Sequence, residues 1–282
     1  MPMTTGISSE RVELSVDGED VDIHYRTGGE GPPMVFLHGI GLDAATVSWR
    51  HALPALAPER TVYALDLPGH GDSDKPDRTY TTDYYLETLS EFLDALAIEE
   101  PALAGLSMGG AVALGHALDG GPVERLVLVD SYGLGADAYW RTAASSVLQT
   151  PILGNMLWQG VGSSQSAIRN SLRSMGPGEP PQQLVEDVDS AVDRQTVRAM
   201  RRWQRSEFRW SGFRTDYSDR LAELDVPTML IHGAVDPLLP RRWSEQAAGT
   251  VTDSTLKIFE NCGHCPPREH PDRFNRAVRT FC

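Results

Sequence analysis

The sequence predicts an α/β protein with a mostly parallel central sheet, helices on both of its faces, and a helical cap inserted after the sixth strand. Three observations lead to this prediction. Short apolar runs, typical of strands buried on both faces, recur along the chain. Helical patterns separate these runs, and such alternation indicates a parallel sheet with right-handed crossovers. The alternation then breaks between about residues 133 and 221, where we expect the cap.

The predicted strands begin with two alternating segments, residues 11–16 and 21–25. The turn sequence Asp17-Gly18-Glu19-Asp20 lies between them and predicts a β-hairpin. The apolar runs that follow lie at residues 34–37, 61–65, 102–106, 126–129 and 228–231, with a weaker one at 256–259. In parallel sheets the chemistry gathers outside the carboxyl ends of the strands, so the residues directly after each run are the candidates for function.

Apolar residues at helical spacing predict helices around residues 53–57, 85–96 and 111–118, and a closing helix over residues 267–281. The stretch 133–221 has no buried-strand run, but it has several Gly and Pro breaks and an amphipathic segment at 192–208. We therefore expect a core domain made of residues 1–132 and 222–282, and a helical cap of residues 133–221 over the carboxyl edge of the sheet.

Composition limits the class of protein. The 282 residues are 40% hydrophobic, which is enough for a sizeable core. A formal net charge of -14 argues against a nucleic-acid partner, which requires a basic surface. No apolar run reaches the roughly 18 residues of a membrane span, and the N-terminus lacks the pattern of a secretory signal. We expect a cytoplasmic protein with no membrane partner, either a monomer or a homo-oligomer.

The first candidate for chemistry is Ser107, in the pentapeptide Gly105-Leu106-Ser107-Met108-Gly109. Gly-x-Ser-x-Gly between a buried strand and a helix is the nucleophile elbow, a tight turn that places the hydroxyl at the top of the sheet. The hydroxyl also lies at a helix N-terminus, where the dipole favours a developing oxyanion. The bare pentapeptide is a weak signal, but the strand before it and the helix after it make it a strong one.

A serine hydroxyl needs a base to accept its proton, and the chain has eight histidines. His264 follows the last strand run and precedes the closing helix, so it lies at the same edge of the sheet as Ser107. A structural or surface role is favoured for six others, namely His24, His38, His51, His70, His116 and His232, and His270 falls inside the closing helix pattern or at its cap. The imidazole in turn needs a carboxylate to hold its tautomer. Two aspartates, Asp130 and Asp236, follow buried strands, and this pattern alone leaves both open.

The oxyanion of a transition state needs hydrogen-bond donors. His38-Gly39-Ile40-Gly41 directly follows the run 34–37, and glycine there allows the backbone to turn and point an N–H group inward. The expected donors are the backbone N–H groups of Ile40 and Met108.

Cys262-Gly263-His264-Cys265 spells the active-site tetrapeptide of protein disulfide isomerases. In those enzymes most of a thioredoxin domain follows it, whereas here only 17 residues remain. A structural zinc site needs four ligands, and no second close pair supplies them. We interpret both cysteines as small packing residues around a functional histidine, and we expect no metal and no organic cofactor.

These motifs, taken in order, resemble those of the α/β-hydrolase superfamily over about residues 12–281. The matching segments are His38-Gly39, Asp66-Leu67-Pro68-Gly69-His70-Gly71-Asp72-Ser73, the serine pentapeptide, His232-Gly233 through Asp236, and Gly263-His264. The resemblance implies the sheet and the cap described above. It also implies that Asp236, after a His-Gly-x-x-Asp turn, is the acid, with Asp130 as second choice.

Within the superfamily, Ser107 argues against epoxide hydrolases and haloalkane dehalogenases, which carry aspartate at that position. The chain resembles the capped esterases, and also the hydrolases that cleave carbon–carbon bonds in products of aromatic ring opening. Many of the latter carry tryptophan after the catalytic histidine, where this chain has Cys265.

We therefore expect a serine hydrolase that cleaves a small or medium carboxylic ester with an apolar part. The expected catalytic residues are Ser107, His264 and Asp236. The residues expected to contact the substrate are His38, Gly39, Trp140, Trp158, Leu238 and Cys265. Two alternatives stay open, a carbon–carbon bond hydrolase and a ligand sensor without turnover on the same fold. Arginines recur at helical spacing between residues 194 and 214 of the expected cap, and this pattern favours a solvated helix face over a pocket for a carboxylate.

Overall fold

An eight-stranded sheet forms the centre of the molecule, in a computed structural model that describes residues 6–138, 164–209 and 212–282. The strands are β1 (Ser8–Val16), β2 (Glu19–Gly28), β3 (Pro33–Leu37), β4 (Thr61–Leu65), β5 (Ala102–Leu106), β6 (Arg125–Val129), β9 (Thr228–Gly233) and β10 (Ser254–Phe259). Their order across the sheet is β1-β2-β4-β3-β5-β6-β9-β10. The β1–β2 and β2–β4 pairs are antiparallel and all other pairs in this sheet are parallel, so the prediction of a mostly parallel sheet is confirmed.

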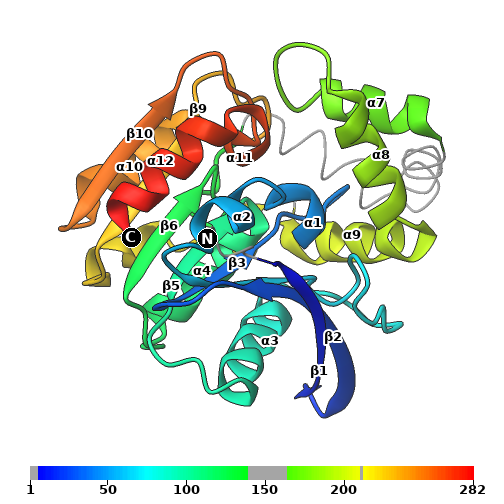
Figure 1. Cartoon of the computed structure of the whole chain (residues 1–282). Helices are drawn as coiled ribbons and strands as arrows, with labels where there is room; N and C mark the ends of the chain where they lie inside the picture. Colours follow the sequence, from blue (N-terminus) through cyan, green and yellow to red (C-terminus); the bar gives the residue numbers. More distant parts are fainter. Residues whose placement is uncertain (1–5, 139–163, 210–211) are drawn as a thin grey trace.

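Helices cover both faces of this sheet (Figure 1). They are α1 (Ala45–Ser48), α2 (Ala52–Leu56), α3 (Thr82–Ala95), α4 (Met108–Leu118), α10 (Arg241–Thr250), α11 (Pro266–Glu269) and α12 (Pro271–Phe281). One hydrophobic cluster joins a face of the sheet to α3, α4 and α10. A second cluster joins the opposite face to α1, α2 and α12.

Strand β3 shows why the apolar runs are continuous. Successive side chains of a strand point to opposite faces. Val35 and Leu37 accordingly belong to the first cluster, while Met34 and Phe36 belong to the second. A strand covered on both faces needs an apolar residue at every position, and all four are fully buried.

Between β6 and β9 the chain forms the part of the predicted cap that the structure describes. Its elements are α7 (Gln165–Arg173), α8 (Gln182–Ala191), α9 (Arg194–Glu207), β7 (Phe208–Arg209), β8 (Gly212–Phe213) and the 3₁₀ helix η1 (Ser218–Glu223). Helices α7, α8 and α9 lie together at one side of the molecule (Figure 1). The short β7–β8 hairpin was not predicted, and η1 continues past residue 221, where we expected the cap to end.

The buried carboxylate of Glu207, at the end of α9, joins this region to the core. It accepts hydrogen bonds from the backbone N–H of Thr82 at the start of α3, at 3.2 Å, and from the backbone N–H of Thr215, at 3.1 Å. The hydroxyl of Tyr132, just after β6, donates to it at 3.3 Å. Because three donors from two parts of the fold share one carboxylate, α9 is fixed relative to the sheet.

The closing helix differs from the prediction in one respect. It is two helices, α11 and α12, rather than a continuous helix over residues 267–281. Pro271 has no N–H group to continue the hydrogen bonding of α11, and its fixed φ suits the first turn of a new helix. His270 therefore lies at the junction, as the end of one helix and the start of the next.

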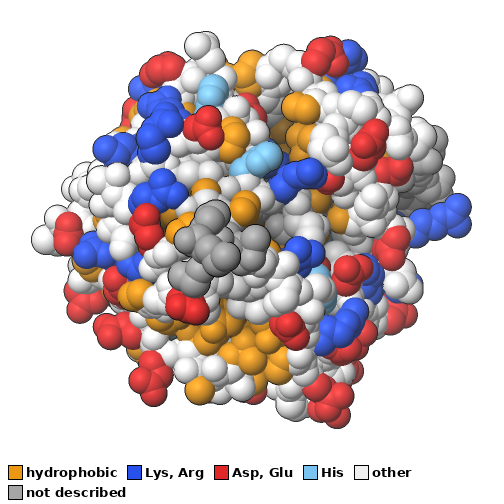
Figure 2. Space-filling model, in the orientation of Figure 1, with side chains coloured by type: hydrophobic (Ala, Val, Ile, Leu, Met, Phe, Trp, Pro, Cys, Tyr) orange, Lys and Arg blue, Asp and Glu red, His pale blue; other side chains and the backbone are white. Residues whose placement is uncertain are grey.

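Acidic and basic side chains are interspersed over the face of the molecule in Figure 2. Within the described ranges, none of the helices has both the length and the apolar character that crossing a bilayer requires.

Candidate active site

Ser107 lies in a sharp turn between β5 and α4, with φ of 54° and ψ of -116°. Positive φ is costly for a residue with a side chain and is typical of strained functional turns. The glycines around it allow the turn. A Cβ on Gly105 would lie 2.2 Å from the carbonyl oxygen of Gly109, and a Cβ on Gly109 would lie 2.3 Å from that of Leu37. The structure therefore has the predicted elbow, with Ser107 at the carboxyl end of β5.

His264 lies in the loop between β10 and α11, and its Nδ1 is 2.8 Å from Oδ2 of Asp236. The other carboxylate oxygen of Asp236 accepts the backbone N–H groups of Leu238 at 2.7 Å and Leu239 at 3.2 Å. Burial disfavours the ionised form of this carboxylate, but His264, His232 and the N–H of Leu238 outweigh burial and hold the pKa of Asp236 below its usual value. Asp236 is thus an ionised carboxylate in contact with the His264 ring.

Asp130, the other candidate acid, lies beside Asp236 but has a different role. Its Oδ1 accepts the backbone N–H of Gly233 at 3.0 Å. Complete burial, together with the charge of Asp236, raises the pKa of Asp130 well above its usual value, so its neutral form is favoured. The structure therefore pairs His264 with Asp236, as the sequence analysis preferred.

The two predicted oxyanion donors, the N–H groups of Met108 and Ile40, lie at the start of α4 and in the loop after β3. Met108 is the first residue of α4, so its N–H group precedes the intrahelical hydrogen bonds. The N–H of Ile40 has no protein acceptor among the described residues. Asp43 shapes this loop, since its carboxylate accepts the N–H of Gly39 at 3.0 Å and the hydroxyl of Ser48 at 2.7 Å.

The loop that carries Gly39 and Ile40 lies directly beside the turn that carries Ser107. A Cβ placed on Gly39 would lie 3.4 Å from Cβ of Ser107. No hydrogen bond joins Ser107 Oγ to His264 Nε2 in the described part of the chain. Such bonds are often long in proteins without substrate and shorten when substrate binds.

The residues expected to contact substrate have different surroundings in the structure. His38 is completely buried, with Nδ1 2.7 Å from the carbonyl of Gly39 and Nε2 accepting the N–H of Leu67 at 3.0 Å. Both ring nitrogens are therefore occupied by backbone groups, and the ring supports the loop instead of offering a nitrogen to a ligand. Leu238 is partly buried beside Asp236. Trp140 and Trp158 lie outside the described residues.

Cys262 and Cys265 are both buried and free. Burial raises the pKa of Cys265 to about 12, and it also raises the pKa of Cys262. Redox-active cysteines instead have lowered pKa values that favour the thiolate. This agrees with the interpretation of the tetrapeptide as packing around His264.

Glu269 is the residue that the sequence analysis missed. Its two carboxylate oxygens accept the N–H of Gly263 at 2.7 Å and the N–H of Cys265 at 3.0 Å, which are the peptide groups on either side of His264. The N–H of His264 itself donates to the carbonyl of Met175, in the predicted cap, at 2.8 Å. A carboxylate at the end of a short helix, five residues after the histidine, is the only sequence signal for this clamp.

Among the residues that the structure describes, two clusters have ligand atoms close enough for a metal ion, His24 with Asp66 and Asp72, and Asp130 with His232 and Asp236. In each cluster both ring nitrogens of the histidine already have partners. His24 contacts Asp66 at 2.7 Å and Ser9 at 2.6 Å, while His232 contacts Ser244 at 2.8 Å and the carbonyl of Leu239 at 3.2 Å. Neither imidazole therefore has a free nitrogen for a metal.

The sheet order, the elbow and the Asp–His pair define the class of protein. A sequence model of the alpha/beta hydrolase family matches residues 34–277, and the chain belongs to this family.

Relatives within the family differ in the reactions that their names state. The chain is 29% identical to a 2-hydroxy-6-oxo-6-(2'-aminophenyl)hexa-2,4-dienoic acid hydrolase of Metapseudomonas resinovorans, over 97% of this chain and 91% of that one. It is 26% identical to a pimeloyl-[acyl-carrier protein] methyl ester esterase of Vibrio vulnificus, over 92% and 98% of the two chains. The structure superimposes on a meta-cleavage product hydrolase from Pseudomonas fluorescens with a TM-score of 0.78 and 25% identity, covering 99% of this chain and 98% of that one.

Proposed function

We propose that this hydrolase is a serine hydrolase in which Ser107 is the nucleophile, His264 the general base and Asp236 the orienting acid. The observation that carries the proposal is the 2.8 Å contact between His264 and Asp236 at the same sheet edge as the strained turn of Ser107. These are the three parts that nucleophilic catalysis by serine requires. A protein that only senses a ligand has no need for them together.

In this mechanism Ser107 Oγ attacks the carbonyl carbon of an ester while His264 takes the hydroxyl proton. The N–H groups of Ile40 and Met108 stabilise the oxyanion of the tetrahedral intermediate. The intermediate collapses as His264 returns the proton to the leaving alcohol, and an acyl group remains on Ser107. Water then gives its proton to His264 and attacks the acyl carbon, which releases a carboxylic acid and restores Ser107.

A fluorophosphonate probe tests the nucleophile. We expect it to label Ser107 alone, as mapped by mass spectrometry of proteolytic peptides, because one hydroxyl among many is activated by His264. The Ser107→Ala protein should show no labelling and no turnover of p-nitrophenyl esters. Labelling that survives in Ser107→Ala would mean that Ser107 is not the nucleophile. A wild-type protein that is neither labelled nor active would favour the sensor alternative.

We propose a small or medium carboxylic ester with an apolar part as the substrate. An ester needs only the oxyanion donors and an apolar pocket, and Leu238 is one partly buried residue near the site that could contribute to it. The esterase among the relatives is consistent with this choice.

The second candidate is cleavage of a carbon–carbon bond in a ring-opened dienoic acid. It is favoured by the names of the dienoic acid hydrolase and the meta-cleavage product hydrolase to which the chain is similar. The deciding experiment gives the protein p-nitrophenyl esters of graded chain length and a ring-cleavage dienone in parallel. A kcat/KM for the dienone about a hundredfold above that of every ester, which corresponds to about 2.7 kcal/mol in the barrier, would decide for the second candidate.

A further inference from the structure

A cavity of about 300 Å³ lies between the predicted cap and the loop that carries His264. One wall is the α7–α8 connection with the ends of both helices, and the other is α11 with the residues before it. Leu172, Met175 and Leu184 supply apolar surface. Cys265 and Arg268 come from the opposite wall. Ser107, Ile40 and Met108 do not line this cavity, so it is distinct from the position of the proposed nucleophile.

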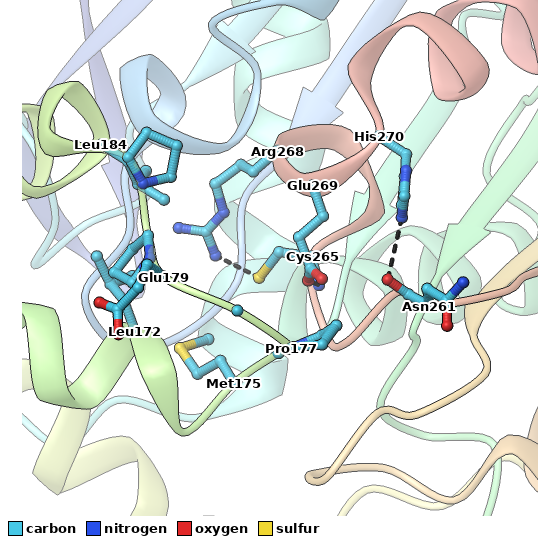
Figure 3. Close-up of a pocket in the computed structure, with 14 residues that line it drawn as sticks. Leu172, Met175, Pro177, Glu179, Leu184, Asn261, Cys265, Arg268, Glu269 and His270 are labelled. Carbon is cyan, nitrogen blue, oxygen red and sulfur yellow. Dashed lines mark hydrogen bonds between the residues drawn. The ribbon is translucent and has the colours of Figure 1, made fainter.

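The guanidinium of Arg268 has hydrogen-bond donors without acceptors. One of its terminal nitrogens donates to Sγ of Cys265. Its Nε and Nη1 are shielded from solvent and have no acceptor in the described ranges. Figure 3 shows the side chain pointing from α11 toward the space between Leu184 and Met175, with the contact to Cys265 drawn as a dashed line.

The acidic side chains near Arg268, in the part of the chain that the structure describes, accept hydrogen bonds from other groups and none from Arg268. Asp43 accepts the N–H groups of Gly39 and Ala44 and the hydroxyl of Ser48. Glu269 accepts the two N–H groups beside His264. Glu179, at the edge of the cavity, pairs with Arg173. No ion pair of Arg268 itself occurs within the described residues.

The sulfur next to Arg268 does not neutralise it. Burial raises the pKa of Cys265 to about 12, even though the neighbouring guanidinium lowers it, so this group is a neutral thiol at physiological pH. Burial lowers the pKa of Arg268, but Cys265, Asp43 and Glu269 outweigh burial and raise it, so the positive charge is stabilised. The N–H donors are what lack partners. Arginine binds carboxylates in a two-pronged geometry that satisfies two of its N–H groups at once. The arrangement is therefore suited to an anion with a planar carboxylate.

We propose that this cavity is a binding site for the carboxylate of a small molecule with an apolar body, and that Arg268 recognises the carboxylate. The apolar body would contact Leu172, Met175 and Leu184. A volume of about 300 Å³ is at the lower end of small-molecule sites and suits a ligand the size of a benzoate ion. The carboxylate belongs either to a separate ligand or to the distal end of the substrate, since Cys265 adjoins His264.

Binding is measured with the Ser107→Ala protein by isothermal titration calorimetry, so that the result does not depend on the proposed hydrolysis. The probes are benzoate and its neutral isostere benzamide. We expect benzoate to bind at least about tenfold more tightly than benzamide, and Arg268→Met to abolish that difference. Arg173→Gln is the matched control, because it removes one positive charge from an arginine that does not line the cavity and is already paired with Glu179, and it should leave both affinities unchanged. Equal binding of the two probes to the unsubstituted cavity, or equal benzoate binding with and without Arg268, would overturn the proposal.

A second variant keeps the test decisive if Arg268→Met fails to fold. Leu184→Trp fills the cavity from α8 without changing any charge, and we expect it to weaken benzoate binding at least about tenfold while circular dichroism stays native. Unchanged benzoate affinity in a folded Leu184→Trp protein would place the binding outside this cavity and contradict the proposal.

The source of the carboxylate is resolved with Ser107 intact. The substrates are p-nitrophenyl hexanoate and the mono-p-nitrophenyl ester of adipic acid, which differ in a terminal carboxylate. If the substrate supplies the carboxylate, Arg268→Met lowers kcat/KM for the adipate ester about tenfold more than for the hexanoate. If a separate ligand supplies it, both esters respond equally to the substitution and benzoate binding is still lost.

Discussion

At the scale of single residues, two neighbouring aspartates take opposite protonation states. Asp236 has a lowered pKa because of its histidines and backbone donors, despite its burial. Asp130 has a raised pKa because it is completely buried and because Asp236 is already charged. One charge in this buried space excludes a second, so the site holds one carboxylate and one neutral carboxyl group.

We predict that Asp236→Asn lowers kcat by about 10⁴, the loss seen in the serine-protease template when the orienting carboxylate is removed. Asp130→Asn should lower kcat less than about tenfold, because an amide is neutral like the protonated carboxyl group. Steady-state kinetics on one ester compares the two variants. A larger loss in Asp130→Asn would assign the acid to the earlier strand.

Asp130 also predicts a pH dependence of stability. Because its pKa is raised in the folded state, the folded protein holds this proton over a pH range in which the unfolded chain, with a pKa of about 3.9, has released it. Release of this proton therefore makes the free energy of unfolding fall as pH rises above about 4. Asn at position 130 cannot titrate, so the free energy of unfolding of Asp130→Asn, relative to that of the wild type, should increase between about pH 4 and pH 7 in urea denaturation. A pH-independent difference would mean that Asp130 is ionised in the folded protein.

Glu269 is predicted to position His264 rather than to touch substrate. Glu269→Ala leaves two N–H groups without an acceptor, at about 1 to 3 kcal/mol each where they are buried. We expect kcat to fall at least about tenfold with little change in KM, since the loop that holds the base becomes less ordered. Glu269→Gln keeps one acceptor oxygen and should recover part of the loss. A loss of stability with unchanged kcat would limit Glu269 to a structural role.

At the scale of elements, α9 has two distinct faces. Its buried face packs Trp203 against Tyr132, with ring centroids 5.4 Å apart, and against Phe208 at 6.0 Å. Arginines line the other face, where Arg198 and Arg202 pair with Asp77 in the connection between β4 and α3. The positions of Arg198 and Arg202 agree with the expectation of a solvated arginine face instead of a pocket for a carboxylate.

The two faces should respond differently to truncation. Trp203→Ala removes a large buried ring and should lower the free energy of unfolding by about 3 to 5 kcal/mol. Arg198→Ala, on the same helix, removes a side chain that is 43% exposed and should change it by less than about 0.5 kcal/mol. Chemical denaturation of both variants checks this contrast. Similar losses would mean that the ion pairs hold α9 in place as strongly as its aromatic packing.

At the scale of the whole molecule, acidic residues dominate. There are 39 aspartates and glutamates against 25 lysines and arginines. Excess charge of one sign destabilises the compact state through repulsion, and salt screens it. We predict that Tm rises by several degrees between about 20 mM and about 0.5 M NaCl. The uncharged osmolyte sucrose, at matched osmolality, controls for effects unrelated to screening. A Tm that falls with salt would mean that attractive pairs such as Arg60–Glu124 outweigh the repulsion.

The local features of this protein follow from its sequence by itself. Continuous apolar runs specify strands covered on both faces, as β3 shows, and helical periods specify α3 and α9. The turn at Ser107 is local in part, because the carbonyl of Gly109, four residues away, requires glycine at position 105. Glycine at position 109 is required instead by Leu37, which comes from the neighbouring strand β3. The break at Pro271 was readable from proline chemistry, although we predicted one closing helix there.

Only the tertiary structure decided what depends on contacts between distant segments. The pattern of strand ends left Asp130 and Asp236 as alternatives, because burial and neighbouring charge set protonation and neither is written in the local sequence. The role of Glu269 depends on hydrogen bonds from the N–H groups on either side of His264, which only the folded structure shows. Likewise, only the fold shows that backbone groups occupy both ring nitrogens of His38, which we had expected to contact the substrate. The cavity at Arg268 is lined by α11 and the α7–α8 connection, which are far apart in the chain. The packing of such elements determines which hydrogen-bond donors are left without acceptors.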